Sequence, residues 1–485
     1  MARVETTTTP ALTPATAIVA HWRFDAAVLA VAAVLIRLPA FFAGRSLVFD
    51  DGVFASSALA MRAGEVPFRD IFSSQGPVFL PLVWVGDLIG FRTLDAPRLV
   101  AVAAGVLLTV AVYACARRLT TRANALLAAG LVTTSGSILW VTGPVNADGP
   151  SLALSVLAVA CALRYRDEPR LRTAIWVGLA AGGAGSIKAL AVPAVVIAGL
   201  IVLVAHRRVR DAGVAAGTAV AVYVLAALPF GIARVWDQSY TYHHDSRRAN
   251  TRWGAVEKIL GTLWDRDVMV MVALGLAAIA FAVRFVRRRR AGVPGDRALA
   301  VVVAGLVVWI ALVVALLVWE PAMWRAHIAH LVPPLALLAS LRPAPWSLLA
   351  VGGVVVAAFF VSNNSSILWP DGYTGPEAAL VHHLQQFPAD AQIISDDPGW
   401  VWRSGHRPPG DFADPSYQRI DQGRITPASV VKAARGRQVC GVIVSSPEHF
   451  GRFRGLPQAL GDEGFHAVRY GTNITLYERD PCAPR

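Results

Sequence analysis

Long apolar runs of Ala, Val and Leu recur through the first 362 residues of the chain and alternate with short polar segments. Most runs approach the ~20 residues that cross a bilayer as a helix. They predict membrane-spanning helices at residues 24–42, 97–116, 123–141, 150–163, 173–187, 189–205, 212–232, 267–284, 298–319, 328–341 and 346–362. Residues 78–91 are also apolar, but this run is short and Asp87 interrupts it. We interpret it as an interfacial or re-entrant helix that does not cross.

Basic loops orient these spans. If residues 78–91 do not cross, the arginine clusters all fall on one side, at residues 117–122, 164–172, 207–210 and 284–290 and at Arg342. Short cytoplasmic loops carry an excess of Lys and Arg, so we expect about eleven crossings of the plasma membrane. The N-terminus is then cytoplasmic and the C-terminal tail extracytoplasmic. The outer loop at residues 233–266 is also basic, although nearby acids offset most of its charge.

Composition supports the same class of protein. The chain is 55% hydrophobic and only 16% charged, whereas soluble domains are nearer a quarter charged. It is therefore expected to be a polytopic α-helical membrane protein whose partner is the lipid bilayer. The net charge of +13 comes from loop arginines, so no nucleic-acid partner is predicted. Residues 1–22 are rich in Thr, Ala and Pro and are predicted to be a disordered cytoplasmic segment, followed by a membrane domain over residues 23–362.

From residue 363 the chain becomes polar, and residues 363–485 are predicted to form a soluble extracytoplasmic α/β domain. Its expected helices are 377–387, behind a capping box at Thr374, and one that starts at Thr426–Pro427 and ends at Gly436. Its expected strands are 392–395, 439–445 and a closing hairpin at 467–470 and 474–478. Asp396 and Asp397 are interpreted as a turn. Cys440 and Cys482 can pair if the tail is extracytoplasmic, and the sequence leaves that pairing open.

Two adjacent acids, Asp50 and Asp51, follow the first span and open the first outer loop, residues 43–96. Carboxylates at the edge of hydrocarbon can hold a cation or take a proton from an attacking hydroxyl, or they can simply end the helix. The next stretch, residues 53–64, is expected to be a helix on the membrane surface. The irregular segment at residues 67–77 follows it. Irregular backbone at membrane depth survives only where protein or a wet cavity solvates it, so this loop is expected to line a cavity.

Three further polar residues each have two interpretations. Asp148 either caps the helix that follows it or faces Asp50 across the cavity. Asp70 is either a second acid or a turn residue, and Lys188 either reaches the interface or binds a ligand. Cationic donors suit a lipid phosphate, and those predicted on the outer side are Lys188, Arg247, Arg248, Arg325, His243, His244, His327 and His330. The spacing of His327 and His330 supplies only part of a metal site.

The membrane part resembles the GT-C class of integral-membrane glycosyltransferases, in particular aminoarabinose transferases, protein O-mannosyltransferases and related polyprenyl-phosphate-sugar enzymes. The motifs that carry this resemblance are Arg37-Leu38-Pro39, Phe49-Asp50-Asp51-Gly52, Arg69-Asp70 with Gln75-Gly76-Pro77, Asn146-Ala147-Asp148-Gly149-Pro150, Gly185-Ser186-Ile187-Lys188, and Trp324-Arg325 with His330 and Pro333-Pro334. Many relatives have Asp-Glu where this chain has Asp50-Asp51, which leaves open how the two carboxylates divide their roles.

The resemblance implies an inverting hexosyl- or pentosyltransferase. It would move a sugar from a polyprenyl-phosphate donor to a glycan, lipid or protein acceptor on the outer face. Asp50 would be the base, and Asp51 would orient the acceptor or help hold a divalent cation, the one cofactor considered. The remaining residues that the resemblance places in the site are Asp148 with the catalytic acids and Asp70, Gln75, Lys188, Arg247, Arg248, Arg325 and His327 around the donor.

Two other functions are compatible with a polytopic membrane protein of this kind. A transporter or lipid-linked-sugar flippase would need polar groups along its spans with access to both faces, whereas these spans are nearly free of acids. A non-catalytic scaffold that presents the tail would not need acids and cations gathered on one side. The one-sided polar set therefore favours an enzyme.

Overall fold

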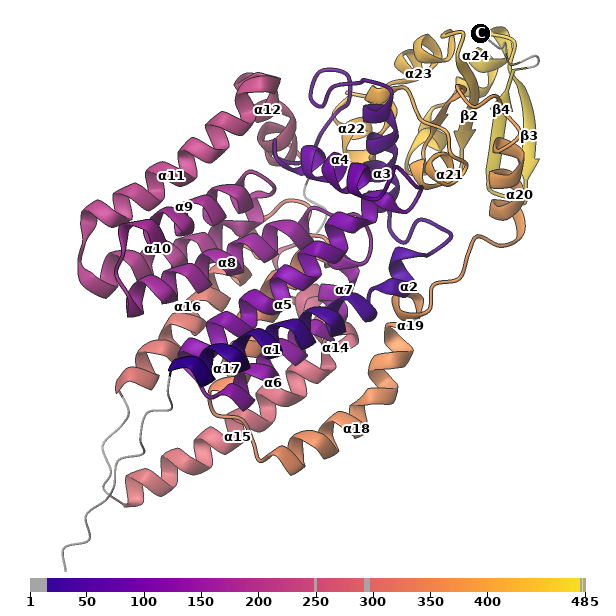
Figure 1. Cartoon of the computed structure of the whole chain (residues 1–485). Helices are drawn as coiled ribbons and strands as arrows, with labels where there is room; N and C mark the ends of the chain where they lie inside the picture. Colours follow the sequence, from indigo (N-terminus) through magenta and orange to yellow (C-terminus); the bar gives the residue numbers. More distant parts are fainter. Residues whose placement is uncertain (1–14, 248–250, 292–296, 480–481, 483–485) are drawn as a thin grey trace, which may run out of the picture.

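The computed structural model describes residues 15–247, 251–291, 297–479 and 482. It is mostly helical, with a bundle at one end and a small sheet at the other (Figure 1). The helices of the bundle are α1 (Ala15–Leu35), α5 (Leu99–Leu119), α6 (Arg122–Thr133), α7 (Gly136–Thr142), α8 (Asp148–Asp167), α9 (Leu171–Gly185), α10 (Val192–His206), α11 (Val209–Ala227), α15 (Val268–Arg290), α16 (Arg297–Trp319), α17 (Val332–Leu341) and α18 (Trp346–Asn363).

The bundle confirms the predicted class of multi-pass membrane protein. Within the described residues, six helical segments are long and apolar enough to cross a bilayer, and α6 with α7 adds a seventh if this bent pair is one span. The count of eleven crossings stays a prediction. The N-terminal prediction is partly wrong, because α1 already begins at Ala15, and residues 1–14 lie outside the described residues.

The predicted single span 123–141 is broken into α6 and α7, which meet at an angle of 61°. The hydroxyl of Ser135 accepts a hydrogen bond from the Ile138 amide and so caps the start of α7. Ser135 and Ser137 also donate to the buried carboxylate of Asp267, both at 2.5 Å. A local cap and a distant acid together stabilise the break, which apolarity alone did not reveal.

One buried arginine shows how closely the helices of the bundle approach each other. Arg37, at the end of α1, is fully buried and donates to the Thr142 hydroxyl at 2.8 Å and to the Ala33 carbonyl at 2.8 Å. A Cβ at Gly105 of α5 would lie 2.1 Å from the Arg37 Nε. Glycine is therefore the residue that lets α5 pass this side chain.

The first outer loop holds α3 (Phe49–Arg62), α4 (Phe79–Ile89) and the 3₁₀ turn η1 (Ala96–Arg98). The predicted surface helix at residues 53–64 is wrong in its setting, because α3 is buried from Asp51 to Ala60. Its small residues allow a tail helix, α21 (Pro398–Arg403), to lie against it: a Cβ at Gly52 would be 2.5 Å from the Gly399 amide nitrogen. At ~16 Å, α4 is much shorter than the ~30 Å hydrocarbon core, as expected for a helix that does not cross.

The tail contains a four-stranded sheet in the order β1-β2-β4-β3. Its strands are β1 (Gln392–Ser395), β2 (Val439–Val444), β3 (His466–Tyr470) and β4 (Ile474–Glu478). β1 and β2 run parallel, and the other two pairs are antiparallel. All four strands lie where the sequence predicts them.

Helices flank this sheet: α20 (Gly375–Leu384), α21, α22 (Tyr417–Asp421), α23 (Pro427–Ala434) and α24 (Leu456–Asp462). Thr426 forms a capping box with Ser429, as its sequence context suggested. The capping box predicted at Thr374 is wrong, because its side chain caps nothing. Pro376, the second residue of α20, has no N–H, which removes one of the two donors that a cap can use.

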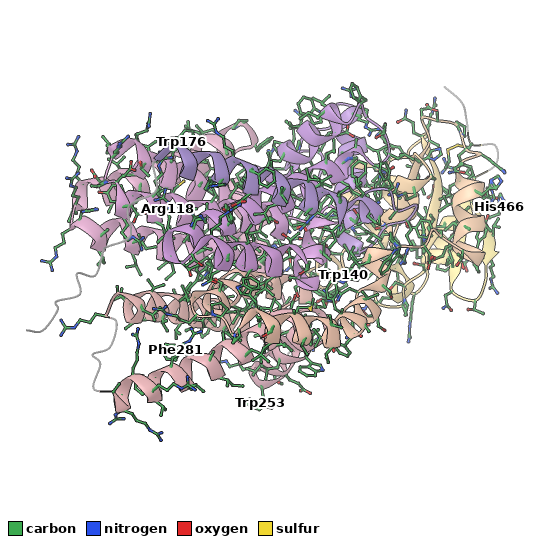
Figure 2. The ribbon with its side chains drawn as sticks, turned by 60° about the horizontal axis from the view of Figure 1, so that its bottom comes forward. Arg118, Trp140, Trp176, Trp253, Phe281 and His466 are labelled. Atoms are coloured by element: carbon green, nitrogen blue, oxygen red, sulfur yellow. A yellow bond between two sulfur atoms is a disulfide. The ribbon has the colours of Figure 1, made fainter. Side chains whose placement is uncertain are left out.

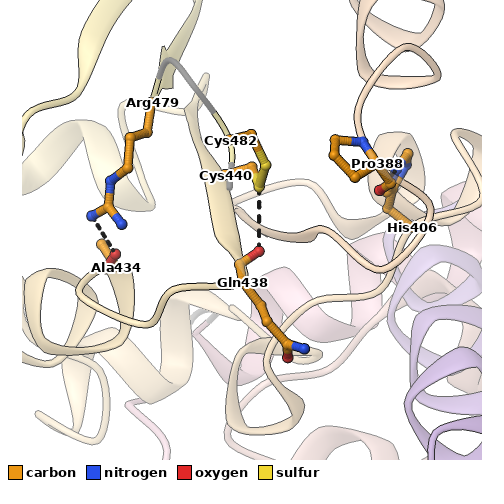
Figure 3. Close-up of a disulfide and its surroundings, with 7 residues drawn as sticks. All are labelled: Pro388, His406, Ala434, Gln438, Cys440, Arg479 and Cys482. Carbon is orange, nitrogen blue, oxygen red and sulfur yellow. Dashed lines mark hydrogen bonds between the residues drawn. A yellow bond between two sulfur atoms is a disulfide. The ribbon is translucent and has the colours of Figure 1, made fainter. Parts of the chain in front are cut away.

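A disulfide joins Cys440 on β2 to Cys482 near the end of the chain, as Figure 3 shows. Asp396 and Asp397 have structural roles, in agreement with the predicted turn. The Asp396 carboxylate accepts from the amides of Ser445 and Ser446, and that of Asp397 caps α21 through the Gly399 amide.

The tail is docked on the membrane part through several polar contacts. Trp402 Nε1 donates to the Leu94 carbonyl at 2.9 Å, and Arg403 pairs with Asp95 at 2.7 Å. Three further contacts reach other segments of the outer loops: Arg407–Glu65 at 2.6 Å, Arg424–Asp237 at 2.8 Å and Ser56 Oγ to the Pro398 carbonyl at 3.0 Å. These contacts hold the tail over the end of the bundle where α3 lies.

Candidate active site

Asp50 lies in the first turn of α3, where an acid is favoured by the helix dipole. It is partly exposed, and one carboxylate oxygen accepts from the side-chain amide of Asn146 at 3.1 Å. Burial raises the pKa of Asp50 to about 6, with the nearby charge of Lys188 opposing the shift and those of Asp148 and Asp414 adding to it. Asp50 is thus a carboxylate poised to exchange a proton close to neutral pH.

Asp51, the next residue of α3, has a different environment and is fully buried. Arg98 donates to both of its oxygens, at 2.5 Å and 3.2 Å. The backbone amides of Leu47 and Val145 donate to the same carboxylate, at 3.0 Å and 2.8 Å. This pattern ties the first loop to η1 and to the turn before α8. Both oxygens of Asp51 therefore serve the fold, and Asp50 is the acid of the pair with an accessible oxygen.

Asp148 is the first residue of α8 and is fully buried. Its carboxylate pairs with Lys188 Nζ at 2.8 Å and with His330 Nε2 at 3.3 Å. Its backbone amide donates to the side-chain oxygen of Asn146 at 2.8 Å. Because the nitrogen of the same side-chain amide donates to Asp50, Asn146 links the Asp50 carboxylate to the backbone of Asp148. The structure therefore brings Asp148 close to Asp50, as one of the two sequence interpretations required.

Lys188 lies where α9 gives way to the 3₁₀ turn η2 (Ala189–Ala191), and its backbone is extended there. Its ammonium group also donates to His327 Nε2 at 3.1 Å. Since Nε2 then accepts, the ring proton of His327 is on Nδ1, which donates to Glu320 at 2.8 Å. Burial would raise the pKa of Glu320, but His327 and Lys188 together hold it below its ordinary value. Lys188 is thus a paired cation held by Asp148 and His327, which belong to two other parts of the chain.

We refer to these residues together as the Asp50 cluster: Asp50, Asn146, Asp148, Lys188, Glu320, His327 and His330. They come from four separate parts of the chain and are joined by hydrogen bonds. The cluster contains five of the charged or titratable residues that the sequence analysis assigned to the outer side: Asp50, Asp148, Lys188, His327 and His330.

The irregular segment of the first loop packs against the non-helical residues between the end of α9 and Lys188. The Gly76 amide donates to the Ile187 carbonyl at 2.9 Å, and the Val78 amide donates to the Ser186 carbonyl at 3.1 Å. A Cβ at Gly76 would lie 2.2 Å from the Ser186 oxygen, so only glycine fits at this contact. The freed carbonyls of the break are thus satisfied by another loop.

Gln75 and His243 belong to the same neighbourhood. The Gln75 side chain is buried beside Ser74, whose carbonyl is bonded to His243 Nε2 at 2.7 Å. Burial lowers the pKa of His243 to about 4, which keeps this ring neutral at physiological pH.

Other candidates lie apart from the cluster. Asp70 pairs with Arg69 at 2.7 Å and accepts from the Val66 amide at 2.9 Å, which is the geometry of a turn residue. Arg325 is half-exposed, 3.9 Å from Asp265, and Arg247 is exposed. Arg248 lies outside the described residues.

The described residues contain no group of three or more His, Cys, Asp or Glu side chains placed to hold a metal ion. Asp50 and Asp51 have different partners and do not converge on one point. The divalent cation therefore stays a prediction from the resemblance, and no step below uses it.

Sequence reasoning missed the contribution of the tail. A series of ring contacts runs from Phe49, beside Asp50, through His449 and Tyr417 of the tail to Trp324, with centroid separations of 5.4, 6.4 and 5.8 Å. Asp414, also from the tail, accepts from the Ser416 amide at 3.0 Å, and the Ser416 hydroxyl is 2.8 Å from that of Tyr242. Glu320 was also missed. The sequence signal for Glu320 is that this isolated acid lies between Trp319 and Pro321, directly after an apolar span.

Comparisons with known proteins agree with this architecture. The model of the dolichyl-phosphate-mannose-protein mannosyltransferase family matches residues 74–232. No curated protein sequence matches the chain significantly. ArnT from Cupriavidus metallidurans, solved bound to undecaprenyl phosphate, is similar in structure with a TM-score of 0.66 and 14% identity, over 97% of this chain and 100% of that one.

A second solved structure is more distant. The oligosaccharyltransferase AglB from Archaeoglobus fulgidus, in complex with an inhibitory peptide and a dolichol-phosphate, has a TM-score of 0.51 at 12% identity. The match covers 95% of this chain and 74% of that one. The resemblance read from the motifs is thereby confirmed, and the chain is a membrane protein with the GT-C fold of these glycosyltransferases.

Proposed function

We propose that this protein is an integral-membrane glycosyltransferase that moves a sugar from a polyprenyl-phosphate donor to a hydroxyl acceptor. The observation that supports this proposal most strongly is the series of hydrogen bonds from Asp50 through Asn146 and Asp148 to Lys188. It places a carboxylate with a raised pKa near a held cation. The lipid phosphates bound by ArnT and AglB support the choice of donor.

In the proposed reaction, Asp50 accepts the proton of the acceptor hydroxyl while the oxygen of that hydroxyl attacks the anomeric carbon of the donor sugar. The bond from that carbon to the phosphate oxygen breaks at the same time, so one displacement inverts the configuration. The departing phosphate carries the negative charge. Among the described residues, two of the three Lys188 ammonium hydrogens are directed at Asp148 and His327, which leaves one for a phosphate oxygen.

Two observations support an extracytoplasmic location for the cluster. The Cys440–Cys482 disulfide is typical of an oxidising compartment, and its domain is docked on α3, which carries Asp50. The arginine-rich loops lie at the opposite helix ends, which is the side that faces the cytoplasm in most membrane proteins. The sugar would therefore be transferred on the outer face of the plasma membrane.

The test is a screen of polyprenyl-phosphate sugars with the purified protein in nanodiscs, comparing the native chain with Asp50→Asn. The substitution keeps the shape of the side chain but removes the base, so transfer should fall at least ~100-fold. Asp371→Asn, which changes an exposed acid in the linker to the tail, is the matched control and should retain activity. Normal turnover by Asp50→Asn would contradict the proposal.

A further inference from the structure

Two adjoining cavities lie at the end of the bundle remote from the Asp50 cluster. α8 begins at Asp148 in the cluster and ends at Asp167, and its 20 residues extend ~30 Å. α5 likewise begins beside Arg98, which binds Asp51, and ends at Leu119. The cavities are lined by residues at these far ends, so about one bilayer thickness separates them from the cluster.

The first cavity has a volume of about 810 Å³. Four arginines from the ends of different helices line it: Arg118, Arg166, Arg284 and Arg342. The polar residues Thr120, Thr121 and Asn124 are also part of its wall. A wall with this many donors suits an anion larger than a single small ion.

Three of these four arginines, Arg118, Arg166 and Arg284, carry more positive charge than the one acid that pairs with them among the described residues. Arg118 and Arg166 share one carboxylate, that of Asp167, at 2.5 Å and 2.8 Å. Arg284 donates to the Pro343 carbonyl at 3.3 Å, which does not neutralise its charge. Positive charge therefore remains available to a ligand with a phosphate group.

The second cavity, of about 210 Å³, is lined by α15, α16 and α17 and is apolar. Leu274, Ala278 and Phe281 form one side of it. Leu299, Leu341 and Arg342 line both cavities, so the basic cavity adjoins the apolar one at these residues. Figure 2 shows Arg118 and Phe281 toward the same end of the molecule, away from His466 of the tail.

We propose that these two cavities together bind an anionic glycerophospholipid of the adjacent leaflet. Its phosphate headgroup would occupy the arginine-lined cavity, and one acyl chain would lie in the apolar one. A free phosphate would leave the apolar cavity unused, whereas a lipid uses both and gains ~0.8 kcal/mol for each buried CH₂. Trp346, on the wall of the first cavity and half-exposed, has the amphipathic ring typical of headgroup depth.

This site is independent of the proposed sugar transfer. It joins the ends of α15, α16 and α17, which pack on each other, and α16 leads directly to Glu320 in the Asp50 cluster. A lipid bound there would stabilise this side of the bundle, because a ligand that binds only the folded state raises its stability.

The experiment measures the thermal midpoint of the purified, delipidated full-length protein in detergent. Titration is with phosphatidylglycerol, with phosphatidylcholine of the same chains, or with inorganic phosphate. Phosphatidylglycerol should raise the midpoint by several degrees and bind about tenfold more tightly than phosphatidylcholine, since only its headgroup carries net negative charge. Equal effects of both lipids, or an equal effect of inorganic phosphate, would overturn the proposal.

Variants locate the site. Arg284→Gln with Arg342→Gln should abolish the preference for phosphatidylglycerol, and Ala278→Phe, which adds bulk to the wall of the apolar cavity from an exposed position, should weaken binding of both lipids. The matched control is Arg287→Gln with Arg288→Gln, two exposed arginines on the same helix that do not line the cavity. If the control loses as much binding as the cavity variants, the effect is general surface charge and the proposed site is wrong. Displacement of phosphatidylglycerol by polyprenyl phosphate at equal concentration would also overturn it.

Discussion

Asp50 and Asp51 are neighbours in the sequence, yet the fold gives them opposite environments. Asp51 is buried, and Arg98 and two backbone amides satisfy its oxygens. Asp50, the preceding residue, is partly exposed. Its contact with Asn146 connects it through Asp148 to the ammonium group of Lys188. Charge type and sequence spacing cannot separate these two roles, because the separation depends on which face of α3 meets η1.

The two acids should therefore differ in what they do to stability. Asp51→Asn leaves the buried Arg98 without a charged partner, and breaking such a pair costs about 3–5 kcal/mol. We expect a clear fall in the thermal midpoint of the purified protein. Asp70→Asn removes an exposed pair with Arg69 and should change the midpoint very little. Equal midpoints for the two variants would contradict the anchoring role of Asp51.

The pKa of Asp50, raised by burial to about 6, predicts a pH dependence of the transfer rate. The base must be ionised, so the rate should be level above pH ~7 and fall about tenfold per pH unit below pH ~6. Protonation of this partly buried acid removes an unfavourable charge, so this group alone makes the fold more stable as pH falls through 6. Rates and thermal midpoints measured from pH 5 to 8 should thus move in opposite directions in this window. A rate that stays level down to pH 5 would rule out Asp50 as the base.

At the scale of elements, small residues decide which segments meet. α3 is buried because Gly52 lets the backbone of α21 approach, and the first loop reaches the break before Lys188 because Gly76 does the same. The sequence identified α3 as a mildly amphipathic helix but assigned its open face to the membrane surface. Its true partner, α21, lies more than 300 residues further along the chain, and no local pattern announces such a contact.

Gly52→Ala tests the contact between α3 and α21. Its added methyl would meet the Gly399 backbone at 2.5 Å, and overpacking of this kind costs about 1–3 kcal/mol. We expect faster hydrogen exchange in residues 398–403 and a lower thermal midpoint. Gly199→Ala in α10, where nothing lies within 4 Å of the added Cβ, is the matched control and should slightly stabilise its helix. If both variants behave alike, α3 and α21 are not held as tightly as described.

At the scale of the whole molecule, one helical bundle separates two chemically different ends. One end joins the Asp50 cluster to the disulfide-linked tail, and the other end carries the arginine-lined cavity. Helices such as α8 and α16 run from one end to the other. The orientation of this bundle in the membrane therefore decides on which side the proposed chemistry occurs.

Labelling of intact cells tests the orientation. A cysteine at Thr472, which is exposed between β3 and β4, should react with an impermeant maleimide. A cysteine at Arg288, at the arginine-rich end of α15, should react only after the cells are permeabilised. The reverse pattern would show that the tail faces the cytoplasm and would contradict the proposed outer-face reaction.

The sequence by itself determined the class of the protein and most of its elements. Apolar length marks membrane helices because a bilayer has a set thickness. Short apolar runs marked the strands of the tail, and a capping pattern at Thr426 marked one of its helices, because these signals are local. It also named most members of the Asp50 cluster, since isolated charges beside apolar spans are rare and conspicuous.

Only the tertiary structure decided which of those charges meet. It paired Asp148 with Lys188, placed Asp70 in a turn, left Arg325 on the surface and broke the span at Ser135. It also laid the tail, with Tyr417 and Asp414, over the end of the bundle that carries Asp50. Each of these outcomes depends on contacts between residues far apart in the chain, and these contacts arise from packing and charge pairing that no local pattern records.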